Sequence, residues 1–397
     1  MFCSKTLRPF PRGLLVLGMI CGGLSFAGAQ ETILESYGRI FIRSSLNTKV
    51  NVLADAATDE AAPEFYGALC ELALRFVMGN APLFREDPDM LSITLTAVKG
   101  LGEYAYGPGA ETLWQVFLHF PDRAIRYEIL KTLPVLKSPA LASEAASFLA
   151  EQNSRYGSEL GFDPGLLSGL FGVLGALGDD GCYPVLFAST LIYSGDLETE
   201  ARRALYAVPG DLTAFCQAVI LRNPPEEKLE AFRIGMNREG ADAGEQSLLA
   251  EAALEAALAS SAASSARYRE LCDLALRFIG ESGAVRSLPL VLKYYNQVQW
   301  AFRSDPSRRE ELAAAIACLS ALRDAESARA LGLQLGLYNS RSGPLSPEEE
   351  EIALALIGAL GGLAYKASRD TLYYAAAFSP SGRIREAAEE ALAQLRW

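Results

Sequence analysis

The sequence predicts an all-α protein built by repeating a helical unit, and three observations support this prediction. Apolar residues recur at three- and four-residue spacing from Ala61 onward, which is the period of one face of an α-helix. The stretch from Asp87 to Leu133 returns without a gap from Ser346 to Leu392. Small polar residues followed by proline recur along the chain and are typical of helix starts. Together these features predict stacked pairs of helices.

Residues 1–29 have the layout of a secretory signal peptide. Lys5, Arg8 and Arg12 give a positive start, residues 13–26 are apolar, and the three residues before Gln30 are small. Cleavage is therefore expected before Gln30. The apolar run is shorter than the about 20 residues that span a bilayer. An uncleaved N-terminal anchor stays open as the alternative.

The charge balance argues against two classes of partner. The whole chain has a net charge of −12, and residues 1–29 hold three basic residues and no acidic one, so the chain from Gln30 carries −15. Nucleic acids and anionic membrane surfaces both attract basic proteins. We therefore expect an acidic, exported protein, periplasmic or secreted, with no nucleic-acid partner and no stable membrane insertion after cleavage.

Five cysteines follow the expected cleavage position, and their spacing does not indicate a disulfide framework. They are odd in number, widely separated and without a CxxC pair, whereas disulfide scaffolds are short and rich in cysteine. The segment LCELALRF from Leu69 returns as LCDLALRF from Leu271, which predicts equivalent packing positions for the cysteines in it. We expect each to be a small buried apolar residue, and a single bridge stays open. The five are Cys70, Cys182, Cys216, Cys272 and Cys318.

Residues 30–60 are expected to form an N-terminal cap segment, because a solenoid needs an end piece with a polar outer face. Residues 61–397 are then the repetitive body. The apolar residues of the cap segment fit either two short helices or a strand-like lead-in, and they are Ile33, Ile40, Ile42, Val50, Val52 and Leu53.

Six helix starts combine a small polar residue with a following proline. The side-chain oxygen accepts an N–H of the first helical turn, and proline fits the first position because its missing N–H would have no partner there. Ser346 and Glu349 also have the spacing of a capping box. The six pairs are Asp87-Pro88, Ser138-Pro139, Asp163-Pro164, Asn223-Pro224, Asp305-Pro306 and Ser346-Pro347.

Four of these starts are followed by a leucine at the same distance, fourteen residues on. In three of the four the next residue is a glycine, namely Gly102, Gly178 or Gly361. Glycine adopts the left-handed conformation that ends many helices, so a tight turn is expected at these positions. The clearest repeats are residues 87–136, 163–208, 305–338 and 346–397.

Three of the repeats continue into a helix that carries an arginine near its start. The segments GRIREAAEEALAQL from Gly382 and ETEARRALYAV from Glu198 are the best examples. With a period of about 40 residues and two helices per unit, the chain resembles HEAT and armadillo repeats over residues 61–397. The resemblance implies a right-handed α-solenoid of stacked antiparallel helix pairs. It implies little about function.

No arrangement in the sequence indicates catalysis, a cofactor or a metal site. His119 is the single histidine, and the apolar residues around it favour a structural role over that of a general base. The patterns HExxH, CxxC and the EF-hand loop are absent. The glycines between Gly358 and Gly362 lack the lysine of a phosphate-binding loop and fit close helix packing. Glu348–Glu351 stand in the first turn of a helix, where its dipole favours negative charge.

Five residues are candidates for binding a protein partner. Trp300 and Lys293 fall outside the apolar face predicted for residues 288–302, and an off-core tryptophan suits a protein contact. Arg126, Arg202 and Arg385 either line a groove for an acidic partner or bond to the turn of a neighbouring unit, as in the solenoids that the chain resembles. The structural role is favoured for these three.

The sequence therefore predicts a non-enzymatic scaffold or adaptor that binds another protein through its solenoid surface. One row of stacked helices in such folds lines a surface suited to extended partners. Two alternatives stay open: an enzyme of the kind of the HEAT-like lyases, and an envelope assembly component tethered by an uncleaved N-terminus. The last helix, residues 382–395, is expected to close the solenoid.

Overall fold

The structure is a computed structural model of the whole chain, and it describes residues 35–58, 63–82, 87–156, 162–260, 265–341 and 343–395. Within these ranges the regular structure is helical and no strand occurs. The expected signal peptide and cleavage position, residues 1–30, lie outside the described residues. The final Arg396 and Trp397 lie outside them as well. No single described helix is both long and apolar enough to cross a bilayer, and α10 and α11 reach that threshold only when taken together.

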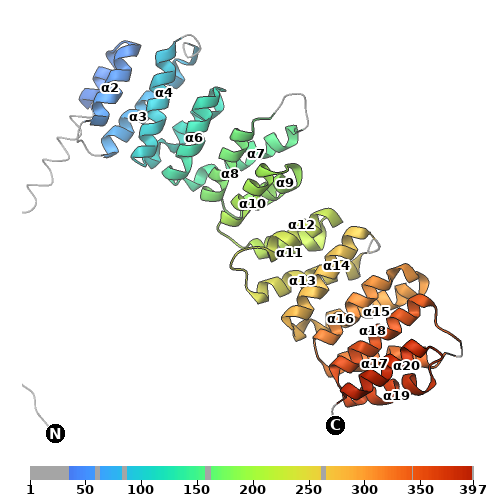
Figure 1. Ribbon diagram of the computed structural model, residues 1–397. Coiled ribbons are helices and arrows are strands. Elements are labelled where there is room, and N and C mark those ends of the chain that lie inside the picture. Colours follow the sequence, from blue (N-terminus) through green and yellow to red (C-terminus); the bar gives the residue numbers. More distant parts are fainter. Residues whose placement is uncertain are drawn as a thin grey trace, which may run out of the picture. The chain divides into compact units, whose positions relative to one another are not determined.

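The chain divides into two compact units, the first ending at Pro209 and the second starting at Gly210 (Figure 1). The helices of unit 1 are a helical stretch at 35–43, α2 (Leu46–Thr58), α3 (Pro63–Gly79), α4 (Pro88–Glu103), α5 (Ala110–His119), α6 (Arg123–Leu136), α7 (Ala142–Arg155), α8 (Pro164–Leu177), α9 (Tyr183–Ile192) and α10 (Asp196–Ala207). The helices of unit 2 are α11 (Leu212–Arg222), α12 (Pro225–Met236), α13 (Ala243–Ala259), α14 (Ala266–Ser282), α15 (Leu288–Ser304), α16 (Arg309–Ala321), α17 (Ala325–Asn339), α18 (Pro347–Leu363), α19 (Arg369–Phe378) and α20 (Gly382–Gln394).

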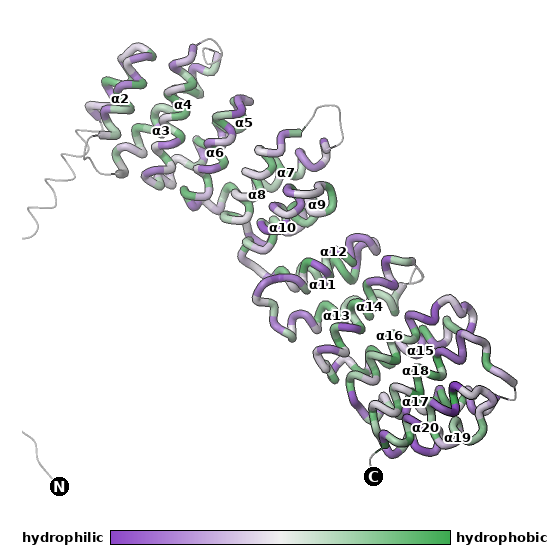
Figure 2. The backbone as a smooth tube through the Cα atoms, viewed as in Figure 1, coloured by the Kyte–Doolittle hydropathy of each residue, from purple (hydrophilic) through white to green (hydrophobic). Residues whose placement is uncertain are grey.

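Each unit is an α-solenoid made of two rows of helices. The even-numbered helices form one row and the odd-numbered helices the other. Each helix packs on its partner across the rows, and most helices also pack on the next member of their own row. Hydrophobic and hydrophilic residues alternate along most helices, because only one side of each faces the interior (Figure 2). In both units contact along the even row is the more extensive.

Small residues explain why the even row packs so closely. A Cβ added at any of several even-row glycines would lie close to an atom of a neighbouring even-numbered helix, so the two helices approach where a side chain is missing. The pairs are Gly102 with Thr132, Gly169 with Leu130, Gly175 with Ala204, Gly280 with Ala321 and Gly361 with Ala391, at 2.7 to 3.3 Å from the added Cβ.

The expectation that Gly102 and Gly361 form the turns is wrong. Both lie inside the last turn of α4 and α18, and the left-handed residue comes three positions later, at Ala105 (φ 49°) and Ala364 (φ 54°). Gly178 caps α8 with an extended φ of −66° rather than a left-handed one. Close packing between helices therefore explains why glycine occurs at Gly102 and Gly361.

The match between the two repeats extends to every element. α4, the 3₁₀ turn η2 (Gly107–Gly109), α5 and α6 correspond at a constant offset to α18, η7 (Lys366–Ser368), α19 and α20, apart from their C-terminal ends. The left-handed alanines named above are also a matched pair. The repeated sequence thus specifies a repeated three-helix arrangement.

Three of the six polar-proline pairs cap long helices as expected. Asp87 and Asp163 accept backbone N–H groups of the first turns of α4 and α8, and Ser346 and Glu349 form the capping box of α18. Asp305 caps the short turn η6 (Pro306–Arg308) that precedes α16. The other two pairs differ from expectation: Ser138 makes no capping bond at η3 (Pro139–Leu141), and Pro224, not Asn223, occupies the cap position of α12.

All five cysteines after residue 29 are buried, unbridged thiols. Burial raises the pKa of Cys70, Cys216, Cys272 and Cys318 to about 12, and the pKa of Cys182 in the same direction. Cys70 and Cys272 do not occupy equivalent places, however, since α3 belongs to the odd row of its unit and α14 to the even row. The repeated segment buries a cysteine in both helices, but the two helices belong to different rows.

Candidate protein-binding surface

Two of the candidate arginines stabilise the fold. Arg126 is the fourth residue of α6, and its Nε donates to the carbonyl oxygens of Phe117 and Phe120 at 3.1 Å, at the C-terminal end of α5. Arg385 is the fourth residue of α20, and its Nη1 donates to Ser379 O at 2.7 Å and Pro380 O at 3.3 Å. Both guanidinium groups thus cap the preceding helix of their own pair. The expected bond to a neighbouring unit's turn is not what these two arginines make.

The remaining arginine is also engaged within the chain. Arg202 lies half-buried in α10, and its Nη2 pairs with Glu198 Oε1 one turn earlier at 2.8 Å. A guanidinium group in such an ion pair has fewer N–H donors available for a partner protein than a free one. The contacts of all three arginines favour the structural role.

Two lysines make the same kind of cap, which sequence reasoning missed. Lys49 and Lys228 are the fourth residues of α2 and α12, and both are buried. Lys49 Nζ donates to Ser44 O at 2.7 Å and to two further carbonyls after residue 40, and Lys228 Nζ donates to Ile220 O. A sequence pattern could have indicated these caps: in four helices that each follow a short helix, the fourth residue is a lysine or an arginine.

Trp300 and Lys293 both lie exposed on α15. The indole is 71% exposed, and Lys293 is on the same outward stripe of the helix, two turns earlier. Lys293 makes no ion pair with any described residue. Arg385 is exposed as well, but its guanidinium is held by the carbonyl oxygens named above, so Trp300 and Lys293 are the stronger candidates for a partner contact.

Unit 2 carries a larger exposed apolar surface that the sequence analysis did not single out. Leu333 and Leu337 on α17 and Tyr373, Tyr374 and Phe378 on α19 point outward, with Phe378 66% exposed. The rings of Tyr374 and Phe378 are 4.9 Å apart. We call these five residues the aromatic face. α17 and α19 are neighbours in the odd row, so the five residues lie on adjacent helices.

A groove of about 400 Å³ separates α15 from α17 next to this face. Its walls combine leucines with uncharged amides and two arginines, Arg303 and Arg329. Two buried polar atoms in its lining residues, the hydroxyl of Tyr295 and Oε1 of Gln334, have no hydrogen-bond partner among the described residues. Burial raises the pKa of Tyr295, so its hydroxyl keeps its proton at neutral pH.

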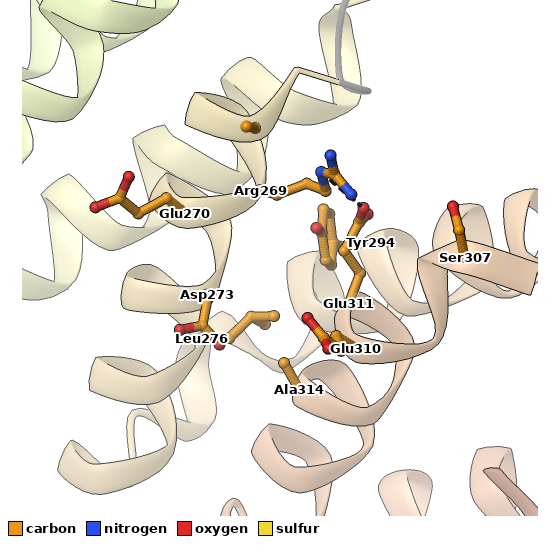
Figure 3. A pocket seen from close by; sticks show the side chains of 10 residues that line it. Arg269, Glu270, Asp273, Leu276, Tyr294, Ser307, Glu310, Glu311 and Ala314 are labelled. Carbon is orange, nitrogen blue, oxygen red and sulfur yellow. Dashed lines mark ion pairs between the residues drawn. The ribbon is translucent and has the colours of Figure 1, made fainter. Parts of the chain in front are cut away.

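A second groove, of about 370 Å³, lies between α14 and α16 with Tyr294 at its base (Figure 3). Four carboxylates line it, but arginines compensate their charge. Glu311 Oε2 pairs with Arg308 Nη2 at 2.5 Å, and Arg269 reaches the same carboxylate at 3.9 Å (Figure 3). Glu270 pairs with Arg233 and Arg267, Asp273 with Arg277, and Glu310 with Arg309. The carboxylates of this groove are therefore paired with arginines and leave little negative charge to attract a cation.

The described part of the chain contains one histidine and five cysteines. No group of three or more His, Cys, Asp or Glu residues there is placed to hold a metal ion. His119 is exposed at the end of α5, and its ring lies 6.1 Å from that of Phe120. The five thiols are buried and their raised pKa values keep them protonated, which makes them poor nucleophiles.

Comparison with known proteins gave structural similarity only. No protein-family model matches the chain, and no curated protein matches it. Solved structures with 11 to 15% identity do match. An engineered protein is 15% identical over 91% of this chain and 98% of its own, with a TM-score of 0.30, and β-catenin from a study of its interaction with cadherin is 11% identical over 94% and 97% of the two chains, with a TM-score of 0.32. A chain of a SYS-1/POP-1 complex is 12% identical over 83% of this chain and 63% of its own, with a TM-score of 0.28. These TM-scores are low, and the solenoid described above rests on the chain's own helices.

Proposed function

We propose that this protein is an exported, non-enzymatic scaffold that binds another protein through the odd row of unit 2. The aromatic face is the observation that carries this proposal. Large apolar side chains exposed together on neighbouring helices mark interaction surfaces, and Tyr and Trp are enriched among residues that anchor protein interfaces. Trp300 on the next helix of the row extends the surface.

The rest of unit 2 supports the same interpretation. The interior of the unit is filled by its own buried side chains, and the tightly packed even row offers mostly charge-paired grooves. The odd row combines a groove, exposed aromatic rings and unpaired cationic groups. A solenoid row of this kind presents a long surface that a partner can follow.

The proposed place of action, the periplasm or the extracellular space, rests on the signal-peptide pattern of residues 1–29. Mass spectrometry of the N-terminus of the protein purified from its native envelope tests this part. A chain that begins at Gln30 is the expected result. A chain that still begins at Met1 would favour the membrane-tethered alternative.

The binding proposal is tested by comparing two variants in quantitative affinity capture from native envelopes. The face variant carries Tyr373→Ser and Phe378→Ser, and the control carries Leu191→Ser, an exposed apolar residue of α9 in unit 1. We expect partners captured by the unmodified chain to fall at least tenfold for the face variant and to persist for the control. Equal capture by both variants, with both shown to be folded by circular dichroism, would overturn the proposal.

A further inference from the structure

The groove between α15 and α17 combines cationic, amide and apolar side chains. Its lining contains three leucines, three amide side chains and two arginines against a single acid, Glu326. The chain as a whole has a net charge of −12. A locally cationic groove on an acidic protein attracts a ligand of opposite charge.

The two arginines are available for such a ligand. Arg303 and Arg329 make no ion pair and no hydrogen bond with the described residues. Most arginines of unit 2 are instead paired, as Arg309 is with Glu351 and Arg341 with Glu349. A guanidinium group recognises a carboxylate through paired N–H donors. The ligand is therefore expected to bring carboxylates to Arg303 and to Arg329.

The amides of the α15 wall specify a second kind of contact. Asn296 is exposed and Gln299 is partly exposed, and both line the groove. Oε1 of Gln334 and the hydroxyl of Tyr295 have no hydrogen-bond partner among the described residues, but both atoms are closed off from the solvent. A polypeptide backbone supplies N–H and C=O groups in alternation, and in an extended chain they remain free for such side chains.

The leucines set the third requirement. Leu333 and Leu337 line the groove and are also part of the aromatic face, so the groove opens onto that face. Both are more than half exposed. An apolar side chain of a ligand that lies along the groove would cover them and remove their surface from water.

We propose that the α15–α17 groove binds an extended acidic segment of a partner protein, with carboxylates on Arg303 and Arg329, backbone groups on Asn296 and Gln299, and a large apolar side chain on Leu333 and Leu337. This inference rests on the proposed scaffold function and names the chemistry of the partner. It requires no change in the fold, because each group already lines the groove.

The first test uses synthetic peptides as the probe. An array of hexapeptides that combine Glu, Gln or Lys with Leu or Ser is probed with the purified chain from Gln30, and affinities are then measured by fluorescence polarisation. Peptides that contain both Glu and Leu are expected to bind, at least tenfold more tightly than their Gln or Ser counterparts. N-methylation of the backbone should also weaken binding. Equal binding of the Glu and Gln series would overturn the proposal.

The second test uses matched charge variants. Arg303→Gln with Arg329→Gln removes the two groove cations, and Arg222→Gln removes an exposed, unpaired arginine of α11 as the control. We expect at least a tenfold loss of peptide affinity for the groove variant and no change for the control. If the groove variant keeps full affinity, the groove is not the site.

The same variants separate this inference from the function on which it rests. If native partners are lost by the Tyr373→Ser and Phe378→Ser variant but kept by the groove variant, the scaffold function stands and the groove assignment fails. If neither variant loses partners, both fail. Analytical ultracentrifugation tests whether a second copy of the chain occupies the groove. A dimer that the groove variant converts to monomer would also overturn the proposal.

Discussion

A single position decides much of the packing within helix pairs. The fourth residue of α2, α6, α12 and α20 is a cation whose hydrogen bonds end on the last carbonyls of the helix before it. Those carbonyls have no partner within their own helix and carry the negative end of its dipole. The cation satisfies them and fixes the angle between the two helices. At Lys49 burial also lowers the pKa of the amine, which shows how far this group is removed from water.

Replacing Arg126 by methionine should destabilise unit 1. The thioether keeps an unbranched apolar side chain but leaves the carbonyls of Phe117 and Phe120 without a donor, and we expect the free energy of unfolding to fall by about 2 kcal/mol. Urea denaturation followed by circular dichroism measures the change. Arg203→Met, at an exposed arginine of α10, is the control and should cost less than about 0.5 kcal/mol. Equal losses for the two variants would contradict the capping role.

The buried thiols give a second residue-scale prediction. Burial removes all five thiols from the solvent, and it raises the pKa of four of them to about 12 and that of Cys182 in the same direction, so the reactive thiolate is scarce at pH 8. A chain starting at Gln30 should therefore react with a thiol reagent such as DTNB at none of its five cysteines in the native state, and at all five in guanidinium. Fast native labelling of any cysteine would show that its helix opens or is misplaced.

At the scale of the element, the missing side chains of the even row set the distance between helices. Gly361 of α18 lies against Ala391 of α20, and an added Cβ would be 2.9 Å from Ala391 Cβ and 3.1 Å from its Cα. Gly358 lies one turn earlier in the same helix, and an added Cβ there would meet nothing within 4 Å. The two glycines look alike in sequence and differ only in what they face.

Alanine substitutions at these two glycines should have opposite effects. Gly358→Ala should stabilise the protein by about 0.5–1 kcal/mol, because alanine is the better helix former. Gly361→Ala gains the same propensity but forces α20 away, and we expect a net loss of about 1–3 kcal/mol. Thermal unfolding by calorimetry compares them directly. Stabilisation by both substitutions would mean that α18 and α20 are not packed as closely as described.

Asp163 links the start of α8 to α6 and makes this contact sensitive to pH. Burial alone would raise its pKa, but hydrogen bonds from Tyr127 and the N–H of Leu166 and the charge of Arg123 outweigh it and hold the pKa below the usual value. The carboxylate therefore stabilises the fold above its unfolded-state pKa of about 4, and that contribution is lost as the pH falls through the lower native value.

Asp163→Asn keeps a capping oxygen and removes the charge, so it isolates this contribution. We expect the variant to be less stable than the unmodified chain at pH 7 by about 1 kcal/mol, and this difference should shrink as the pH is lowered below 4. Urea unfolding at the two pH values measures it. A difference that does not depend on pH would place the effect in the cap geometry and not in the charge.

The sequence predicted the helices well because each carries its own local signals. The start of α18 at Pro347 and the arrangement of α4 to α6 follow from capping residues and apolar periodicity alone. Gly361 was assigned to a turn because a glycine after a helical run fits that role, and only the neighbouring helix shows otherwise. The aromatic face was missed for the same reason: Phe378 is apolar at a helical spacing, and its exposure depends on which helices surround α19.

At the scale of the whole molecule, the chain divides into two solenoid units. The division falls between Pro209 and Gly210, directly after the repeat of residues 163–208. In unit 2, α20 is the last described member of the even row and packs on both α18 and α19. Its buried residues, among them Ile384 and Ala388, cover the end of the core.

Truncation after Pro380 should expose that core. Removing α20 uncovers the apolar sides of α18 and α19, and we expect the unfolding midpoint to fall by roughly 5–10 °C together with a loss of solubility. Differential scanning fluorimetry and size-exclusion chromatography against the chain that starts at Gln30 measure both. Unchanged stability and solubility would contradict a closing role for this helix.

The close contacts of the even-row glycines also affect which substitutions the sequence can accumulate during evolution. At Gly361 and Gly169 an added side chain would meet a neighbouring helix within 3 Å, so substitutions there carry a cost in stability. At the exposed positions of α15, α17 and α19 no such neighbour restricts the side chain, so substitution there changes the surface without moving the helices. A saturation library read out by folding alone should therefore tolerate fewer substitutions at these two glycines than at Trp300, Tyr373 or Phe378. The exposed positions of the odd row can acquire a new specificity while the helix packing stays intact.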